Sequence, residues 1–190
     1  MAIIAARLAR VAALAAGVAA AVFYARAGLT LSHYDAKGHL VVARRIFDSL
    51  LPGWHQIGAV WLPLPHLLNA LPVQIDAWYR SGLSGVVISI VSGAIAAGAA
   101  AAIVARATGS TAGGLAAAGL IALDPNVLYL QSTPMTEPLL FALTLVSIDR
   151  LARWLDAARA AAPDAPGLSR HAGLALAGAC WTRYEAWPIT

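Results

Sequence analysis

The stretch Tyr34–Leu68 reads YDAKGHLVVARRIFDSLLPGWHQIGAVWLPLPHLL and lies between one long apolar run and several later ones. It is polar for this chain and carries tryptophan and proline, so we expect a loop held against a bilayer surface. It begins with the carboxylate of Asp35, followed one helical turn later by His39 and then by the paired Arg44 and Arg45. An acid, an imidazole and fixed cations beside a membrane are the groups needed to act on an anionic lipid.

The composition indicates a membrane protein. Of the 190 residues, 60% are hydrophobic and only 12% are charged, with a mean hydropathy of +0.72. A soluble domain carries about 25% charged residues. No basic run occurs outside the flanks of the apolar segments, so we expect no nucleic-acid partner. The single cysteine, Cys180, lies in an apolar run, and no Cys/His spacing predicts a zinc site.

Five apolar segments approach the roughly 20 residues needed to cross about 30 Å of hydrocarbon. They are residues 5–25, 83–105, 112–130, 137–155 and 168–190, and residues 26–82 form a long loop after the first. We therefore expect an all-α membrane protein with about five transmembrane helices, which pack through their many small residues. The Ala-rich first segment also resembles a signal peptide, which is the alternative to an anchor.

The placement of arginine predicts the orientation of these segments. With the N-terminus in the cytoplasm, the short cytoplasmic segments are the ones dense in arginine, as the positive-inside rule requires. These arginines are Arg7, Arg10, Arg106, Arg150, Arg153, Arg159 and Arg170. The 26–82 loop, the turn before Glu137 and the Arg183–Glu185 segment then all face outward.

Two amphipathic interfacial helices are predicted in the outer loop. Apolar residues recur at three- and four-residue steps from Asp35 to Leu51, and Pro52-Gly53 ends this pattern. A second helix is predicted over Leu64–Arg80, with Trp78 and Tyr79 suited to the membrane interface. Two helices lying in the membrane plane would form a platform for a lipid head group.

Asp35 and His39 are the candidate catalytic residues. A carboxylate just outside a span can take a proton from an acceptor hydroxyl, or it can cap the helix that follows. His39 lies on the same helix face, where it would orient the carboxylate, bind substrate or share a divalent metal with it. Two ligands are weak evidence for a metal, so no metal site is assigned.

Candidate substrate-binding residues in the loop are mainly cations. Arg44 and Arg45 have the charge to hold a phosphate, although arginines at a head-group surface also snorkel without a specific ligand. The proline-stiffened run from Trp61 to His66 would position Trp61 and His66, or would merely redirect the chain.

Further candidates interrupt the later apolar runs. The turn QSTPMTEP (131–138) brings Glu137 to the start of a predicted helix, where Thr136 is also a good cap. In TRYE (182–185), an arginine and a glutamate inside an apolar run need partners and mark a functional interior. The candidate binding residues here are Glu137, Arg183, Tyr184 and Glu185.

An acid just after the first span, amphipathic helices in the first outer loop and a TEP-type turn before the fourth span resemble the GT-C class of membrane glycosyltransferases. The chain looks most similar to the protein O-mannosyltransferase group and to bacterial enzymes that transfer sugars to lipid A or other envelope acceptors. The resemblance is carried by the Tyr34–Leu68 stretch, by QSTPMTEPLL (131–140) and by TRYEAW (182–187), and it covers nearly the whole chain.

This resemblance implies transfer of a sugar, with inversion and without a cofactor, from a polyprenyl-phosphate donor to an envelope acceptor. The site would lie among membrane lipids at the outer face of a bacterial inner membrane. Asp35 would match the family's first-loop acid and act as the general base on the acceptor, while cations such as Lys37, Arg44 or Arg183 stabilise the departing lipid phosphate.

The chain departs from the family in two respects. In eukaryotic members a second acid directly follows the first, whereas Ala36 stands here, so Glu137 or Glu185 would supply the second carboxylate. Family members also have many more spans, so we expect a chain that stops at Thr190 to be the N-terminal part of a longer enzyme.

Two other classes of function remain as alternatives. The first is a transporter or flippase subunit in which the Arg183–Glu185 pair lines a pathway. A transporter is expected to show a repeat among its spans, and none is visible. The second is a non-catalytic membrane scaffold.

Overall fold

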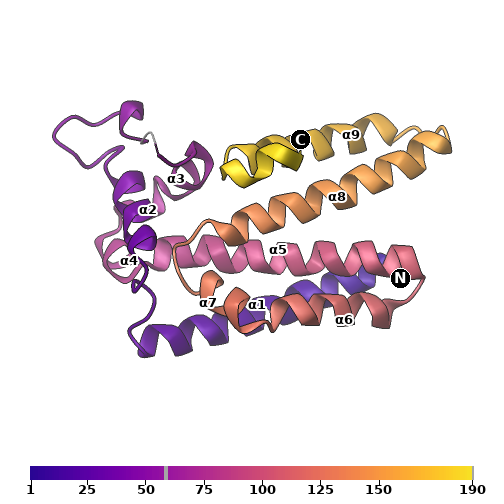
Figure 1. Cartoon of the computed structure of the whole chain (residues 1–190), viewed down its shortest axis with the longest axis horizontal. Coiled ribbons are helices and arrows are strands. Elements are labelled where there is room, and N and C mark those ends of the chain that lie inside the picture. Colours follow the sequence, from indigo (N-terminus) through magenta and orange to yellow (C-terminus); the bar gives the residue numbers. More distant parts are fainter. Residues whose placement is uncertain (58–59, 190) are drawn as a thin grey trace.

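The structure is a computed structural model that describes residues 1–57 and 60–189, and these residues form helices and turns without a β-strand. Figure 1 shows long helices side by side, with a group of short helices at one end. The prediction of an all-α architecture is confirmed for this part of the chain.

The long helices pack around α5. They are α1 (Ala2–Arg26), α5 (Leu83–Thr108), α6 (Thr111–Ala122), α7 (Pro125–Gln131), α8 (Glu137–Arg159) and α9 (Ala165–Cys180). Helix α5 packs against α1, α6 and α8, and α9 packs against α8 (Figure 1). Alanine dominates the core between α1, α5 and α6. At Gly114 a Cβ would lie 2.6 Å from the carbonyl oxygen of Ala101, so small residues are what let these helices approach closely.

Helices occur at all five predicted apolar segments, but among the described residues α1 and α5 are the ones long and apolar enough to span a membrane. Helices α6 and α7 would add a third span if they form one broken helix, which is bent by 66°. The break follows from Asp124-Pro125: the Asp124 carboxylate accepts hydrogen bonds from the backbone N–H groups of Asn126 (2.9 Å) and Val127 (3.1 Å) and so begins a new helix.

The predicted number of about five spans is not confirmed. Helix α8 is not one of the candidate spans, and its second half carries charged residues, including Asp149 and Arg153. The apolar run predicted over 168–190 forms a helix only as far as Cys180 and then changes to the 3₁₀ helix η3 (Tyr184–Ile189). Helix α1 presents large apolar side chains outward, among them Leu8, Val11 and Val18, as expected of a membrane-embedded helix.

The loop helices are shorter than the sequence pattern predicts. They are α2 (Tyr34–Arg44), η1 (Trp54–Ile57), α3 (Pro63–Asn69), η2 (Pro72–Gln74) and α4 (Asp76–Ser81). The first predicted helix ends at Arg44 instead of Leu51. The second prediction was wrong as one helix: α3 ends at Asn69, Pro72 lacks a backbone N–H to continue it, and Ile75 is extended before α4 begins.

We call the end of the bundle that carries α2, α3 and α4 the loop end. Helix α1 finishes there, α5 and α8 begin there, and η3 reaches the same end (Figure 1). The backbone N–H of Leu64 donates to the carbonyl of Trp181 (3.0 Å), which ties α3 to the end of α9. All the predicted site residues therefore lie at one end of the molecule.

The side chain of a buried glutamine lies between α1 and α5. The side chain of Gln131, at the end of α7, is 2% exposed. Its amide lies against Gly17 of α1, where a Cβ would be 3.3 Å from the amide oxygen, and against Gly93 of α5, where a Cβ would collide with that oxygen. The two glycines together make the space that the amide occupies.

Candidate functional site

The turn between α7 and α8 is fixed against the beginning of α5. The hydroxyl of Ser89 lies within hydrogen-bond distance of the carbonyl oxygens of Thr133 (2.9 Å) and Met135 (3.1 Å). At Gly85 a Cβ would lie 2.5 Å from the Pro134 side chain, so only glycine permits this close approach. The turn is thereby held so that α8 begins at the loop end.

Arg183 joins this turn to the C-terminal segment. Its guanidinium donates hydrogen bonds to Thr136 Oγ1 (3.1 Å), Glu137 Oε1 (2.8 Å) and Glu185 Oε1 (2.6 Å). Thr136 occupies the cap position of α8 but makes no capping bond with its side chain. The hydrogen bond between Arg183 and Glu185 is the main cause of the raised pKa of Arg183 and of the lowered pKa of Glu185. We call these four side chains the Arg183 cluster.

Asp35 lies beside the Arg183 cluster without being bonded to it. The cap position of α2 is His33, and Asp35 stands in the first turn. Its carboxylate makes no hydrogen bond or ion pair with any residue in 1–57 or 60–189, yet its charge contributes to the raised pKa of Arg183. The alternative interpretation of Asp35 as a helix cap is therefore wrong, and the carboxylate is available to a ligand.

Two buried histidines lie next to the cluster. His39 Nδ1 and His66 Nε2 are 3.0 Å apart, and the Trp61 ring packs on His39 with ring centroids separated by 4.5 Å. Trp61 reaches this position because residue 38 is glycine, where a Cβ would lie 2.6 Å from the indole. Both terminal side chains of the Trp61–His66 run thus contact His39.

Both imidazoles are neutral near pH 7. Burial, reinforced by the charge of Arg183, lowers the pKa of His39 to about 4. Burial also lowers the pKa of His66 to about 3, with smaller contributions from His39 and Arg45. A neutral pair shares one proton across its hydrogen bond, so one ring donates and the other accepts.

A small cavity of about 20 Å³ adjoins the histidine pair. Its lining includes His66 and Asn69 from α3 and Ser89 from α5. His66 Nδ1 and Asn69 Oδ1 are buried and have no hydrogen-bond partner among the described residues. The space is large enough for a single water molecule. Asn69 and Ser89 were not among the residues predicted from the sequence, because neither belongs to a recognisable motif.

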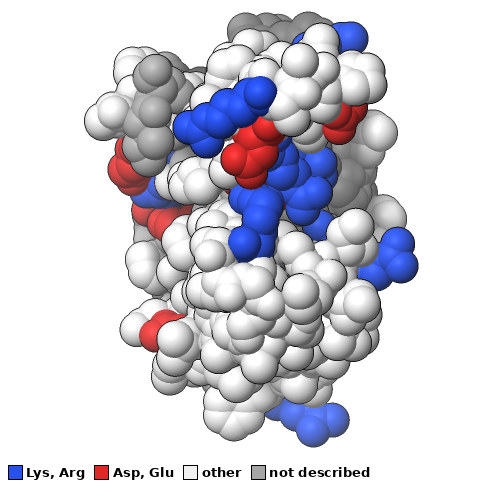
Figure 2. All heavy atoms as spheres, turned by 90° about the vertical axis from the view of Figure 1, so that its right-hand side faces the viewer, with Lys and Arg blue, Asp and Glu red and all other residues white. Residues whose placement is uncertain are grey.

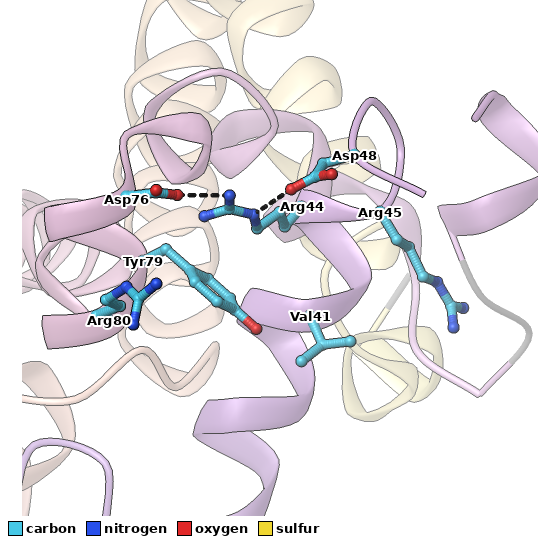
Figure 3. A pocket seen from close by; sticks show the side chains of 7 residues that line it. All are labelled: Val41, Arg44, Arg45, Asp48, Asp76, Tyr79 and Arg80. Carbon is cyan, nitrogen blue, oxygen red and sulfur yellow. Dashed lines mark hydrogen bonds and ion pairs between the residues drawn. The ribbon is translucent and has the colours of Figure 1, made fainter. Parts of the chain in front are cut away.

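Arg44 and Arg45 line a different pocket, shown in Figure 3, instead of joining the Arg183 cluster. The Arg44 guanidinium bridges Asp48 (2.8 Å) and Asp76 (2.5 Å) and lies 4.5 Å from the centre of the Tyr79 ring. The two carboxylates raise the pKa of Arg44, and Arg44 lowers the pKa of Asp76. Arg44 thus has a structural role, and its charge is already balanced.

The other predicted binding residues also lie outside the Arg183 cluster. Arg45 donates from Nε to the carbonyl of Gln56 (2.7 Å). Lys37 is exposed and makes no ion pair with the described residues. The Tyr184 ring packs edge-to-face on Trp187.

No cluster of three or more His, Cys, Asp or Glu side chains suited to a metal occurs in the part of the chain that the structure describes. The metal alternative for Asp35 and His39 therefore finds no third ligand there.

No protein-family model matches the chain, and no curated protein or solved structure is similar enough to count as a match. The features that bear on function lie at the loop end. There, an available carboxylate stands beside a guanidinium held by two other carboxylates, with a neutral imidazole pair behind them. This arrangement can accept a proton at one point and stabilise an anion at another.

Proposed function

We propose that the protein is a membrane glycosyltransferase that uses a polyprenyl-phosphate sugar, with Asp35 as the general base. The observation that carries the proposal is the placement of Asp35, a carboxylate without a bonded partner among the described residues, within electrostatic range of Arg183. A base and a cation at one end of apolar helices are the two groups that transfer from a lipid phosphate requires.

The proposed reaction is a single displacement. Asp35 takes the proton of an acceptor hydroxyl, whose oxygen attacks C1 of the sugar from the face opposite the phosphate. The bond between C1 and the phosphate oxygen breaks, and the polyprenyl phosphate leaves with the bonding electrons. The configuration at C1 is thereby inverted.

Arg183 is the proposed stabiliser of the departing phosphate. A guanidinium can bond two phosphate oxygens at once, and Glu185, which is more exposed than Arg183, can yield its place to the phosphate. Glu137 would then keep the guanidinium oriented, since its second oxygen, Oε2, is buried. Glu137 is accordingly the better candidate for the second carboxylate that the family resemblance implies.

The neutral state of both histidines supports Asp35 as the base and Arg183 as the group that stabilises the phosphate. A protonated His39 next to Arg183 would add a second positive charge and draw Asp35 into an ion pair, which would lower its basicity. Burial keeps His39 neutral instead. The pair then fixes the position of α2, and with it Asp35, without neutralising the base.

The same proposal sets the orientation of the molecule. The loop end lies at the outer face of a bacterial inner membrane and the N-terminus lies in the cytoplasm, with α8 and α9 crossing the membrane beside α1, α5 and α6–α7. The acceptor is a hydroxyl of an envelope component, and no cofactor takes part.

The proposal is tested by Asp35→Asn in membranes supplied with radiolabelled polyprenyl-phosphate mannose and, separately, with the glucose donor. Loss of a general base costs roughly 100- to 10,000-fold in rate, so transfer to envelope acceptors should nearly vanish. Asp48→Asn is the matched control, because it removes a carboxylate from the same loop without touching the Arg183 cluster. Near-normal transfer by a well-expressed Asp35→Asn protein, or movement of intact donor across the membrane without sugar transfer, would refute the proposal.

A further inference from the structure

A second polar pocket lies between α1, α5 and α8, at the end of the bundle opposite the loop end. It encloses about 230 Å³. Its floor consists of small residues of α5, and its charged lining residues are Arg7, Arg10, Asp149, Arg150 and Arg153. Figure 2, which faces this end, shows Lys and Arg side chains gathered around acidic ones, with a largely uncharged surface below them.

The pocket has an excess of positive charge. Asp149 is 5% exposed and already forms ion pairs with two arginines, Arg106 at 2.6 Å and Arg153 at 2.9 Å. Arg7, Arg10 and Arg150 make no ion pair with any residue in the described ranges. Three arginines in and around one cavity thus have no carboxylate among residues 1–57 and 60–189 to balance them, and like charges brought together are unfavourable unless an anion joins them.

The position of Arg10 shows that its side chain is directed at the pocket. At Gly98 of α5 a Cβ would lie 2.5 Å from both Cγ and Nε of Arg10. The arginine therefore lies along α5, over a glycine that leaves room for it, instead of extending away from the bundle. An arginine that only extends its charged group toward the membrane surface would not have to lie over a glycine of the neighbouring helix.

The exposed apolar residues beside the pocket favour a lipid over a soluble anion as its ligand. Ile3 belongs to the same lining and is 60% exposed, and Val11, two turns along α1, is 69% exposed. Helix α1 is one of the two described helices apolar enough to span a membrane. A phosphate bound by the arginines would therefore have an apolar helix face next to it, on which acyl chains can lie. Basic pockets between transmembrane helices are suited to anionic head groups.

We propose that this pocket binds the head group of an anionic phospholipid, with Arg10 and Arg150 as ligands of its phosphate and the exposed face of α1 beside its acyl chains. The site is independent of the Arg183 cluster and of the sugar transfer proposed for the loop end.

The test is native mass spectrometry of the purified protein in detergent with equal amounts of phosphatidylglycerol and phosphatidylcholine. Phosphatidylglycerol should be retained selectively. The Arg10→Ala/Arg150→Ala double variant should weaken its retention by about tenfold or more, because charge-assisted hydrogen bonds to phosphate are lost. Gly98→Ala should weaken it severalfold while leaving every charge in place, since the new methyl group would collide with Cγ and Nε of Arg10 and move that side chain from its place over α5.

Two controls separate the site from general effects. Arg26→Ala removes one positive charge from the other end of α1, and Gly119→Ala adds a methyl group on a helix where nothing lies within 4 Å of it. Both should bind phosphatidylglycerol as the unmodified protein does. Equal retention of the two lipids, unchanged binding by Gly98→Ala and the double variant, or displacement of the lipid by millimolar inorganic phosphate would each overturn the proposal, the last by indicating a site for a soluble anion.

Discussion

The buried pair His39–His66 should make the loop end less stable as the pH falls. The folded pKa values are about 4 and about 3, against an ordinary value of 6.5. Because the folded pKa values lie below the unfolded ones, the unfolded loop binds more protons in this interval. The stabilisation is therefore complete above pH 6.5 and is lost progressively toward pH 3.

The magnitude follows from the size of these shifts. Each histidine costs about 1.4 kcal/mol of stability for every pH unit below 6.5 until its folded pKa is reached. Between pH 6.5 and pH 5 each therefore costs about 2 kcal/mol, and the pair about 4 kcal/mol, if one opening of α2 and α3 exposes both rings. The Glu185 carboxyl, whose pKa is lowered by Arg183, responds only at lower pH.

Hydrogen exchange of the α2 and α3 amides, corrected for intrinsic rates, measures this opening. The protection factors should fall by up to about a thousandfold between pH 6.5 and pH 5, which corresponds to about 4 kcal/mol. Removing one titrating ring with His39→Gln or His66→Gln should reduce the pH dependence by about half. His171→Gln, on the exposed surface of α9, should leave it unchanged. If His39→Gln and His66→Gln both retain the full pH dependence, the reasoning fails.

Two further outcomes are expected. Cysteines introduced at Leu50, which is fully exposed, and at Ala161, in the turn after α8, should react with impermeant reagents from opposite sides of the membrane; labelling of both from one side would contradict the proposed orientation. Gly85→Val should destabilise the protein by roughly 1–3 kcal/mol, because its Cβ would meet Pro134 at 2.5 Å, whereas Gly119→Val has open space. Equal thermal unfolding midpoints for the two valine variants would show that the α7–α8 turn can move away.

The long helices were predictable because their signal is repeated many times along the chain. Residues 83–105 were expected to be helical, and α5 covers Leu83–Thr108. Many apolar residues together determine that such a segment forms a helix, so no single residue decides whether it does. The loop depends instead on single positions, and the pattern over Leu64–Arg80 was periodic enough to conceal the effect of Pro72.

The sequence identified individual residues of the candidate site, but it did not show which of them form contacts with one another. The sequence indicated that Arg183 needs a partner, yet the choice of Glu137 depends on how closely Gly85 lets the turn approach α5. For Arg44 a signal was present in the sequence: Asp48 follows four residues later, which puts both on one face of the predicted helix and favours an ion pair. That spacing by itself favours a structural role for Arg44 over phosphate binding.

The glutamine between α1 and α5 restricts how this part of the chain can change. A larger residue at Gly93 would collide with the amide oxygen, and one at Gly17 would press on that oxygen and on Ile90. A smaller residue at position 131 would leave the space between the two helices unfilled. Close packing thus couples three positions that lie far apart along the chain. A substitution at any one of them changes the fit that the other two provide between the helices.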